Sequence, residues 1–310
     1  MELPFQLRSS ARFEVAGFGT NAVDFLITVP NYPEFGSKVE IDHYRRFPGG
    51  EIATTLSGLQ RLGLSTAYAG RFGDDDAGDF GIESLRAEGV DVSRCERVPN
   101  ATTQIAFIVI DAGTGERTVL WKRDQRLQYN EEEAPADLAQ QAKILHLTPH
   151  DGKACVAMAK AARKAGTIVS VDMDNVFEMT DELLRLTDIL VVSSDLPQKL
   201  FSISNLKEAL RKLHERSGAA MVGITLGSDG SILLCREQFI ETPGYPVPGI
   251  CRDTTGAGDA FRSGLLYGII SGQEVEECAR MANAVAALNC REVGARTALP
   301  VRAELLELLR

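Results

Sequence analysis

The sequence predicts an α/β protein with a mostly parallel central sheet and a small second sheet inserted into its first half. In the second half, apolar runs rich in β-branched residues alternate with helix-like segments, which is typical of a parallel sheet covered by helices on both faces. In the first half, shorter runs that are partly polar and often alternating indicate a separate antiparallel flap. Ligands bind beyond the carboxyl ends of the strands in such sheets, so the loops after those strands are the expected site.

Four short segments make up the expected flap. They cover residues 25–29, 39–45, 103–111 and 117–123. The stretch DAGTGE, residues 111–116, separates the last two segments and has the composition of a turn. We therefore place the flap at about residues 20–47 and 102–124, inserted into a single domain.

The parallel sheet is expected from residue 143 onward. Its strands should cover residues 143–147, 167–173, 188–193 and 220–227, and the helices between them residues 153–166, 181–186 and 205–218. The apolar stretch AFRSGLLYGIISG, residues 260–272, is long enough for a buried helix. Two glycine-rich stretches, TLGSDG at 225–230 and DTTGAGD at 253–259, then fall at the ligand-binding edge of the sheet.

Composition narrows the class of protein. The chain has 310 residues, of which 44% are hydrophobic, and a formal net charge of −10, which disfavours a general nucleic-acid binder. No apolar run approaches the roughly 18 residues of a membrane helix, and the first residues have no signal-peptide pattern. The six cysteines are scattered without a Cys-x-x-Cys pair, as in reduced thiols. We expect a cytoplasmic protein that binds neither nucleic acid nor membranes.

The stretch RDTTGAGDAF, residues 252–261, predicts an anion site at a helix start. Gly256 and Gly258 let the backbone turn sharply and approach a ligand closely, and an apolar helix is expected to follow. Free N–H groups at a helix N-terminus bind phosphate well. Asp259 in the same place has two interpretations, since a carboxylate there is either a helix cap or a group that reacts with the ligand.

Two other patterns in the sequence fail on their context. Gly17, Gly19 and Ala22 match a dinucleotide-binding fingerprint, but the residues after them are β-branched and broken by proline where a helix is required. The acidic stretch GDDDAGD, residues 73–79, lacks the glutamate that closes a calcium loop and suits a helix start instead. His146 and His150 have Pro149 between them, which disfavours a shared metal site, so we expect both to be structural or exposed.

With the anion loop, the carboxylate and the open sheet in place, DTTGAGDAFRSG at 253–264 resembles the C-terminal signature of the ribokinase-like (PfkB) carbohydrate kinases. The stretch from FPGG to AEGV, residues 47–90, resembles the N-terminal region of that family. ITLGSDGS and MANAVAALNCREVGARTALP resemble its nucleotide-side segments. The likeness implies a single ribokinase-like three-layer α/β/α domain over residues 11–310, with the flap as a lid.

The resemblance implies ATP-dependent phosphorylation of a sugar hydroxyl. Asp259 would accept the proton of the hydroxyl, and a proton acceptor within hydrogen-bond reach is what this chemistry needs. The main-chain N–H groups of Gly256, Ala257 and Gly258 would stabilise the charge on the transferring phosphoryl group.

The same resemblance assigns the remaining site residues. On the sugar side it points to Asp24, Gly49 and Gly50, although Asp24 could instead be a turn or strand-edge residue. The nucleotide side would use Thr225, Gly227, Ser228, Gly230 and Asn283, and Asn283 could equally be a satisfied helix residue. A monovalent-cation site, with K⁺ as the expected ion, would use Asp253 and Thr255, unless Asp253 only braces the loop.

Two positions depart from the family pattern. Many relatives have an asparagine that touches the sugar where this chain has Thr54, which cannot make the same pair of hydrogen bonds. Ser193 and Leu196 replace an Asn-x-x-Glu segment linked to magnesium and phosphate, with Asp195 as the nearest carboxylate. Mg²⁺ is still expected, carried mainly by ATP and by waters.

The sequence thus predicts an ATP-dependent kinase of a pentose, ketohexose or related sugar. A nucleoside kinase of the same superfamily and a catalytically weak sugar-binding regulator remain as alternatives, with a dinucleotide-dependent oxidoreductase behind them. An apolar stretch such as AFIVI in the flap is unfavourable when it is exposed to water at an open sheet edge. We therefore also expect a homodimer formed through the lid.

Overall fold

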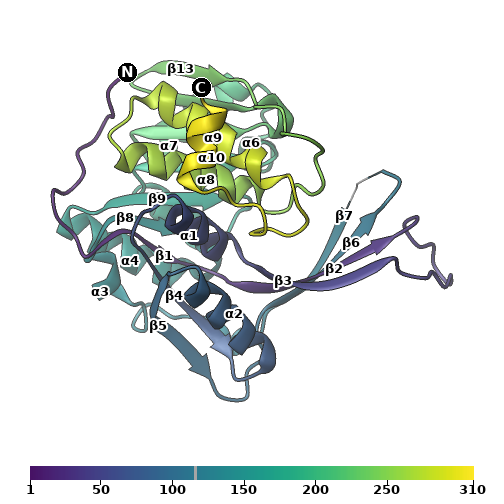
Figure 1. Cartoon of the computed structure of the whole chain (residues 1–310). Coiled ribbons are helices and arrows are strands. Elements are labelled where there is room, and N and C mark those ends of the chain that lie inside the picture. Colours follow the sequence, from purple (N-terminus) through teal and green to yellow (C-terminus); the bar gives the residue numbers. More distant parts are fainter. Residues whose placement is uncertain (115–116) are drawn as a thin grey trace.

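A large twisted sheet forms the centre of the molecule. The structure, a computed structural model, describes residues 1–114 and 117–310 (Figure 1). Within these residues the sheet has the strand order β13-β12-β11-β10-β9-β8-β1-β4-β5. Neighbouring strands pair in parallel except β12, which runs antiparallel to β11 and β13. The strands are β1 (Phe13–Phe18), β4 (Thr66–Gly73), β5 (Asp91–Val98), β8 (Ala142–Leu147), β9 (Ile168–Met173), β10 (Ile189–Ser193), β11 (Met221–Thr225), β12 (Ser231–Cys235) and β13 (Gln238–Thr242).

Helices cover both faces of this sheet and create two hydrophobic cores. One face carries α1 (Glu51–Arg61), α2 (Asp76–Ala87), α8 (Ala257–Ile270), α9 (Val275–Asn289) and α10 (Arg302–Leu308). The opposite face carries α3 (Ala136–Ala139), α4 (Gly152–Ala165), α5 (Thr180–Leu184), α6 (Leu196–Phe201) and α7 (Leu206–Ser217). Successive strand residues point to opposite faces, so Ile144 packs in the first core and Leu145 in the second. The predicted three-layer α/β/α architecture is confirmed.

The lid is a separate four-stranded sheet that projects from the body (Figure 1). Its order is β3-β2-β6-β7, with β2 (Ala22–Val29), β3 (His43–Gly49), β6 (Ile105–Asp111) and β7 (Arg117–Lys122). The expectation of an antiparallel flap was wrong for the central pair, because β2 and β6 run parallel. The strand expected from residue 39 begins only at His43. The turn expected at 111–116 ends with two residues that lie outside the described part of the chain.

The glycines of the dinucleotide-like pattern have a packing role. Strand β1 leads directly into β2, and no helix follows Gly19. A Cβ at Gly17 would overlap the Ile52 side chain of α1, and one at Gly19 would overlap Thr148. These glycines therefore let α1 and the loop after β8 pack closely on β1, as expected from the missing helix.

His146 and His150 contact different side chains within the protein. The buried His146 ring on β8 bonds the Ser170 hydroxyl, with 3.1 Å between Nδ1 and Oγ. Burial lowers the pKa of His146 to about 3, so the ring is neutral. The His150 ring packs against the Phe177 ring at 5.0 Å between centroids.

Candidate active site

In the anion loop, residues 253–258, Asp253 accepts hydrogen bonds from backbone groups and Gly256 has a left-handed backbone conformation. Gly256, with φ of 76°, is the N-cap of α8, and a Cβ there would lie 2.7 Å from the carbonyl oxygen of Ala295. The Asp253 carboxylate accepts hydrogen bonds from the N–H groups of Thr255 and Gly294, both at 2.8 Å. Asp253 therefore braces the loop, one of the two roles expected for it. The Thr255 hydroxyl oxygen is buried and has no hydrogen-bond partner among the described residues.

The start of α8 presents backbone N–H donors beside the Asp259 carboxylate. The Ala257 N–H donates to the carbonyl of Thr254 at 3.1 Å, whereas no described acceptor takes up the N–H groups of Gly256 or Gly258. Together with the N–H of Asp259, which likewise has no described acceptor, these groups are the donors available to an anion. No described group hydrogen-bonds to the Asp259 carboxylate. Burial, followed by the negative charge of Asp172, raises its pKa well above the ordinary range.

A buried ion pair lies beside Asp259. The guanidinium of Arg262, one turn further along α8, contacts the carboxylate of Asp172 at the end of β9, and both residues are buried. Arg262 also donates to the carbonyl of Val191 at 3.2 Å. Burial raises the pKa of Asp172 to about 6, while Arg262 acts in the opposite direction. The sequence analysis missed this pair, whose signal is a charged residue inside each of two apolar runs.

Glu51 brings a further carboxylate to the same place from the start of α1. Burial, and then the charges of Asp172 and Asp259, raise its pKa well above the ordinary value. Its Oε2 has no hydrogen-bond partner among the described residues, and the His150 Nδ1 atom lies 3.8 Å away. The centre of the site is therefore strongly acidic, with Arg262 as the cation paired to it.

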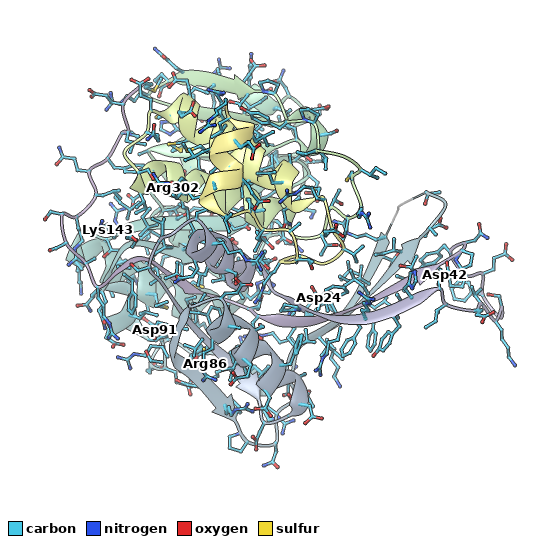
Figure 2. The ribbon with its side chains drawn as sticks, viewed as in Figure 1. Asp24, Asp42, Arg86, Asp91, Lys143 and Arg302 are labelled. Atoms are coloured by element: carbon cyan, nitrogen blue, oxygen red, sulfur yellow. The ribbon has the colours of Figure 1, made fainter. Side chains whose placement is uncertain are left out.

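Asp24 lies where the lid joins the body (Figure 2). It is 6% exposed, and no described group hydrogen-bonds to its carboxylate. Burial raises its pKa to about 6, although the charge of Arg296 lowers it. A Cβ at Gly49 would overlap this carboxylate, and Gly50 has φ of 88°, so both glycines are required by the local geometry.

Arg296 is a buried cation near Asp24 that was not predicted from the sequence. Its guanidinium donates to the Gly49 carbonyl, to the Thr54 hydroxyl at 3.3 Å and to the Ser84 hydroxyl at 3.2 Å. Burial lowers its pKa to about 10, which leaves it charged at neutral pH. Thr54 is completely buried, and its hydroxyl accepts from Arg296 in this structure. A direct contact of Thr54 with a sugar stays a prediction.

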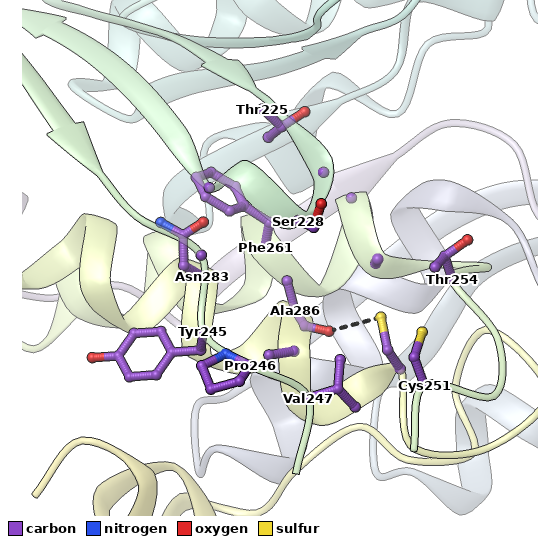
Figure 3. Close-up of a pocket in the computed structure, with 17 residues that line it drawn as sticks. Thr225, Ser228, Tyr245, Pro246, Val247, Cys251, Thr254, Phe261, Asn283 and Ala286 are labelled. Carbon is purple, nitrogen blue, oxygen red and sulfur yellow. Dashed lines mark hydrogen bonds between the residues drawn. The ribbon is translucent and has the colours of Figure 1, made fainter. Parts of the chain in front are cut away.

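The five residues expected on the nucleotide side line one cavity of about 340 Å³ (Figure 3). Thr225, Gly227, Ser228 and Gly230 come from β11 and the turn after it, and Asn283 comes from α9. The Asn283 amide donates to the Ser231 hydroxyl at 2.9 Å and to the Ala279 carbonyl at 3.0 Å. Its N–H₂ group is thus used within the protein. The cavity continues to the anion loop, and its apolar walls, missed in the sequence, include Tyr245, Pro246, Val247 and Phe261.

The comparisons with known proteins agree with this arrangement. Residues 13–302 match the family described as pfkB family carbohydrate kinase. The chain belongs to the pfkB family of carbohydrate kinases.

Named relatives of this pfkB kinase act on different substrates. It is 27% identical to a nucleoside kinase of Methanothermobacter thermautotrophicus, over 93% of this chain and 92% of the relative. It is 28% identical to fructokinase-2 of Oryza sativa subsp. japonica, over 95% of this chain and 93% of the relative. The structure of Arabidopsis thaliana ribokinase complexed with ribose and ATP superposes with a TM-score of 0.85 at 25% identity, over 96% of this chain and 99% of the ribokinase.

Asp195 of the pfkB kinase is tied to neighbours on its own segment. It accepts a hydrogen bond from Ser193 at 2.6 Å and pairs with Lys199 at 2.7 Å. Partial burial opposes these contacts, which lower the pKa of Asp195 below its ordinary value. Leu196, at the position of the family's glutamate, is buried in the core. Over residues 1–114 and 117–310, no three acidic, histidine or cysteine side chains converge as a metal-ligand set.

In the described ranges of the pfkB kinase, no helix has both the length and the apolar character needed to cross a membrane.

Proposed function

We propose that this pfkB kinase transfers the γ-phosphoryl group of ATP to a hydroxyl of a pentose, a ketohexose or a related sugar. The observation that carries the proposal is the position of the α8 N-terminus. Gly258 lines the nucleotide cavity, while the next residue, Asp259, is close enough to Asp24 for the two charges to interact. The reacting groups would therefore meet at one helix turn, between a nucleotide and an acceptor.

In the proposed reaction, the Asp259 carboxylate accepts the proton of the attacking hydroxyl. The hydroxyl oxygen then forms a bond to the γ-phosphorus as the bond to the departing ADP oxygen breaks. The N–H groups of Gly256 and Gly258 donate to the charged phosphoryl oxygens. The raised pKa of Asp259 makes it a stronger base than an ordinary aspartate at neutral pH.

Asp24 is the proposed anchor of the acceptor. A buried carboxylate without protein donors can accept hydrogen bonds from two hydroxyl groups of a polyol. Arg296 holds the Gly49 carbonyl next to it and supplies a positive charge. We propose that Asp24 binds the sugar directly and that Arg296 and Thr54 keep the Gly49–Gly50 loop in place.

Both proposed cations fit the donors that are present. Mg²⁺ neutralises phosphate charge, and we propose that it enters with ATP and is held by phosphate oxygens and waters. The acidic side chains of Glu51 and Asp172 suit such waters. We propose K⁺ beside the anion loop, where the Thr255 hydroxyl has no partner, although both Asp253 oxygens already accept N–H bonds.

A nucleoside is the second candidate acceptor, because the lid carries an exposed aromatic ring, that of Trp121, on the face of Asp24. Asp24 opposes Ala106 across β2 and β6, and Ala106 opposes Trp121 across β6 and β7. Side chains directly opposite each other lie on the same face of a sheet. Trp121 is 63% exposed and offers a surface on which a base could stack.

The opposite face of the lid favours a homodimer. Phe25 stacks between Tyr44 and Phe107, with ring centroids 5.9 and 5.2 Å apart, and Leu120 lies next to Phe107 across β6 and β7. Such an apolar face is costly in water. We propose that it pairs with the same face of a second copy. Light scattering after gel filtration should then give twice the chain mass, and Leu120→Glu should give a monomer.

We propose that residues 11–310 work as one catalytic domain, with lid segments at about 20–47 and 102–124 inserted into it. All six cysteines are free, which suits a reducing compartment such as the cytoplasm.

The test of the proposed function is ADP release with MgATP against a panel of pentoses, ketohexoses, sugar acids and nucleosides, each with and without potassium. Turnover on one sugar should fall by roughly 10²- to 10⁴-fold in Asp259→Asn, the range for loss of a general base. Asp76→Asn, an exposed acid in the first turn of α2, is the matched control and should keep full activity. Sugar binding without turnover anywhere in the panel would favour the regulator, and near-normal turnover by Asp259→Asn would remove that residue from the role.

A further inference from the structure

The nucleotide cavity has two thiols in its wall. Cys251 lies in the segment between β13 and α8 and is exposed, whereas Cys290 lies at the carboxyl end of α9 and is buried. Both line the cavity that also contains Ser228 and Asn283 (Figure 3). None of the other four cysteines lines this cavity.

The backbone holds these two cysteines next to each other. The N–H of Arg252 donates to the carbonyl of Cys290 at 2.9 Å, which joins the residue after Cys251 to Cys290 itself. The Cys290 thiol donates to the Ala286 carbonyl at 3.3 Å, the dashed line in Figure 3, and Cys251 is near enough to raise the pKa of the Cys290 thiol. To form a disulfide, the two side chains would have to rotate until their sulfurs are roughly 2 Å apart.

The two thiols differ in how readily an oxidant reaches them and in how readily they ionise. Burial, and then the neighbouring Cys251, raise the pKa of Cys290 to about 12, which disfavours its thiolate. Cys251 is open to solvent at the mouth of the cavity and is the thiol that a small oxidant reaches first. The charge of Arg117, at the edge of the lid, is near enough to oppose the rise in the pKa of Cys290.

We propose that Cys251 and Cys290 form a reversible disulfide that weakens nucleotide binding. The oxidant is a low-molecular-weight disulfide. The Cys251 thiolate attacks one of its sulfurs, forms a mixed disulfide and releases the first small thiol. Cys290 then loses its proton and attacks the Cys251 sulfur, which releases the second small thiol. In total, two protein thiols are oxidised to one disulfide, and one small disulfide is reduced to two thiols.

The disulfide would weaken nucleotide binding because it would join two segments of the cavity wall. The segment of Cys251 continues directly into Asp253, Thr254 and the anion loop, whereas Cys290 ends α9, the helix of Asn283. A covalent bond there fixes one wall of the cavity against the other and draws Cys251 inward. We expect the KM for ATP to rise about tenfold, the effect of losing roughly one well-made polar contact. This consequence rests on the proposed function, whereas the disulfide itself does not.

The test uses the full chain and oxidised glutathione. After incubation with or without MgATP, free thiols are alkylated and peptides are mapped by mass spectrometry. A Cys251–Cys290 disulfide should form, should form more slowly with MgATP present, and should be reversed by dithiothreitol. Cys290→Ser should instead keep glutathione on Cys251, and Cys251→Ser should leave Cys290 unmodified. Cys95→Ser, a half-buried cysteine outside the cavity, is the control and should behave like the parent chain.

Each variant is compared with its own reduced form, because both cysteines line the binding cavity. Oxidation should raise the KM for ATP in the parent chain and in Cys95→Ser. A mixed disulfide that persists on Cys251 in the parent chain, or two thiols that stay open to alkylation, would refute the disulfide. A disulfide that forms without any change in ATP binding, measured by equilibrium dialysis with labelled ATP, would refute the regulatory consequence. Because mapping and dialysis need no turnover, a protein inactive on the sugar panel still gives a decisive answer.

Discussion

Replacing Asp24 by asparagine should make this kinase more stable while weakening its hold on the acceptor. Asp24 is 6% exposed, and burial raises its pKa to about 6 from an ordinary value of 3.8. The folded protein therefore binds this proton more tightly than the unfolded chain does, so ionisation of Asp24 destabilises the fold. The stability is fully present below the pKa of the unfolded chain and is lost as the pH rises through about 6. A pKa difference of this size corresponds to about 3 kcal/mol at neutral pH.

Thermal unfolding followed by circular dichroism measures this effect. For a chain of this length, Asp24→Asn should raise the Tm by about 5 °C near pH 7.5 and by about a third as much near pH 4.5. Asp42→Asn, an exposed acid at the far end of the lid (Figure 2), is the control and should leave the Tm unchanged at both pH values. The KM for the acceptor should rise roughly tenfold to a hundredfold in Asp24→Asn, since hydrogen bonds to a charged group are lost.

A loss of stability in Asp24→Asn that is equal at both pH values would refute this reasoning. It would mean that the Asp24 carboxylate accepts strong hydrogen bonds in the folded protein and is not held there at a cost. An unchanged acceptor KM would separately remove Asp24 from the binding site.

Three other predictions concern charges and donors around the site. Because the pKa of Asp259 is raised, kcat/KM should increase as the pH rises through that pKa. Asp172→Asn removes a neighbouring negative charge and should therefore move this increase in kcat/KM to lower pH. A pH–rate profile that is the same in Asp172→Asn and the parent chain would contradict this. Arg296→Lys keeps the charge but cannot make the same three hydrogen bonds, so both stability and acceptor KM should suffer, and normal values for both would exclude the supporting role. Thr255→Val should abolish any activation by potassium, and activation that survives would place the cation elsewhere.

Local sequence determined the fold class and identified the residues that line one cavity beside the anion loop. Alternation of apolar and helical segments is a local pattern, and it was enough to predict the parallel sheet and its two covering layers. The anion loop and the turn after β11 are each contiguous stretches, so glycines and hydroxyl groups at fixed spacing identify them without knowledge of the fold. The lid strands were recognised in the same way, but the parallel pairing of β2 with β6 was not, because pairing joins segments far apart in the chain.

Tertiary structure decided which buried side chains surround the candidate site and how their pKa values shift. Arg296 reaches Thr54 across 242 positions of sequence, and Ser84 across 212, so no local pattern could connect them. Burial raised the pKa of Asp24 and Asp172, and burial depends on every element packed around a side chain. Whether Cys251 lies against another cysteine likewise depended on how the end of α9 meets the start of the anion loop. Sequence spacing places donors and turns along one segment, whereas contacts between segments arise only when the sheet brings its loops to the same edge.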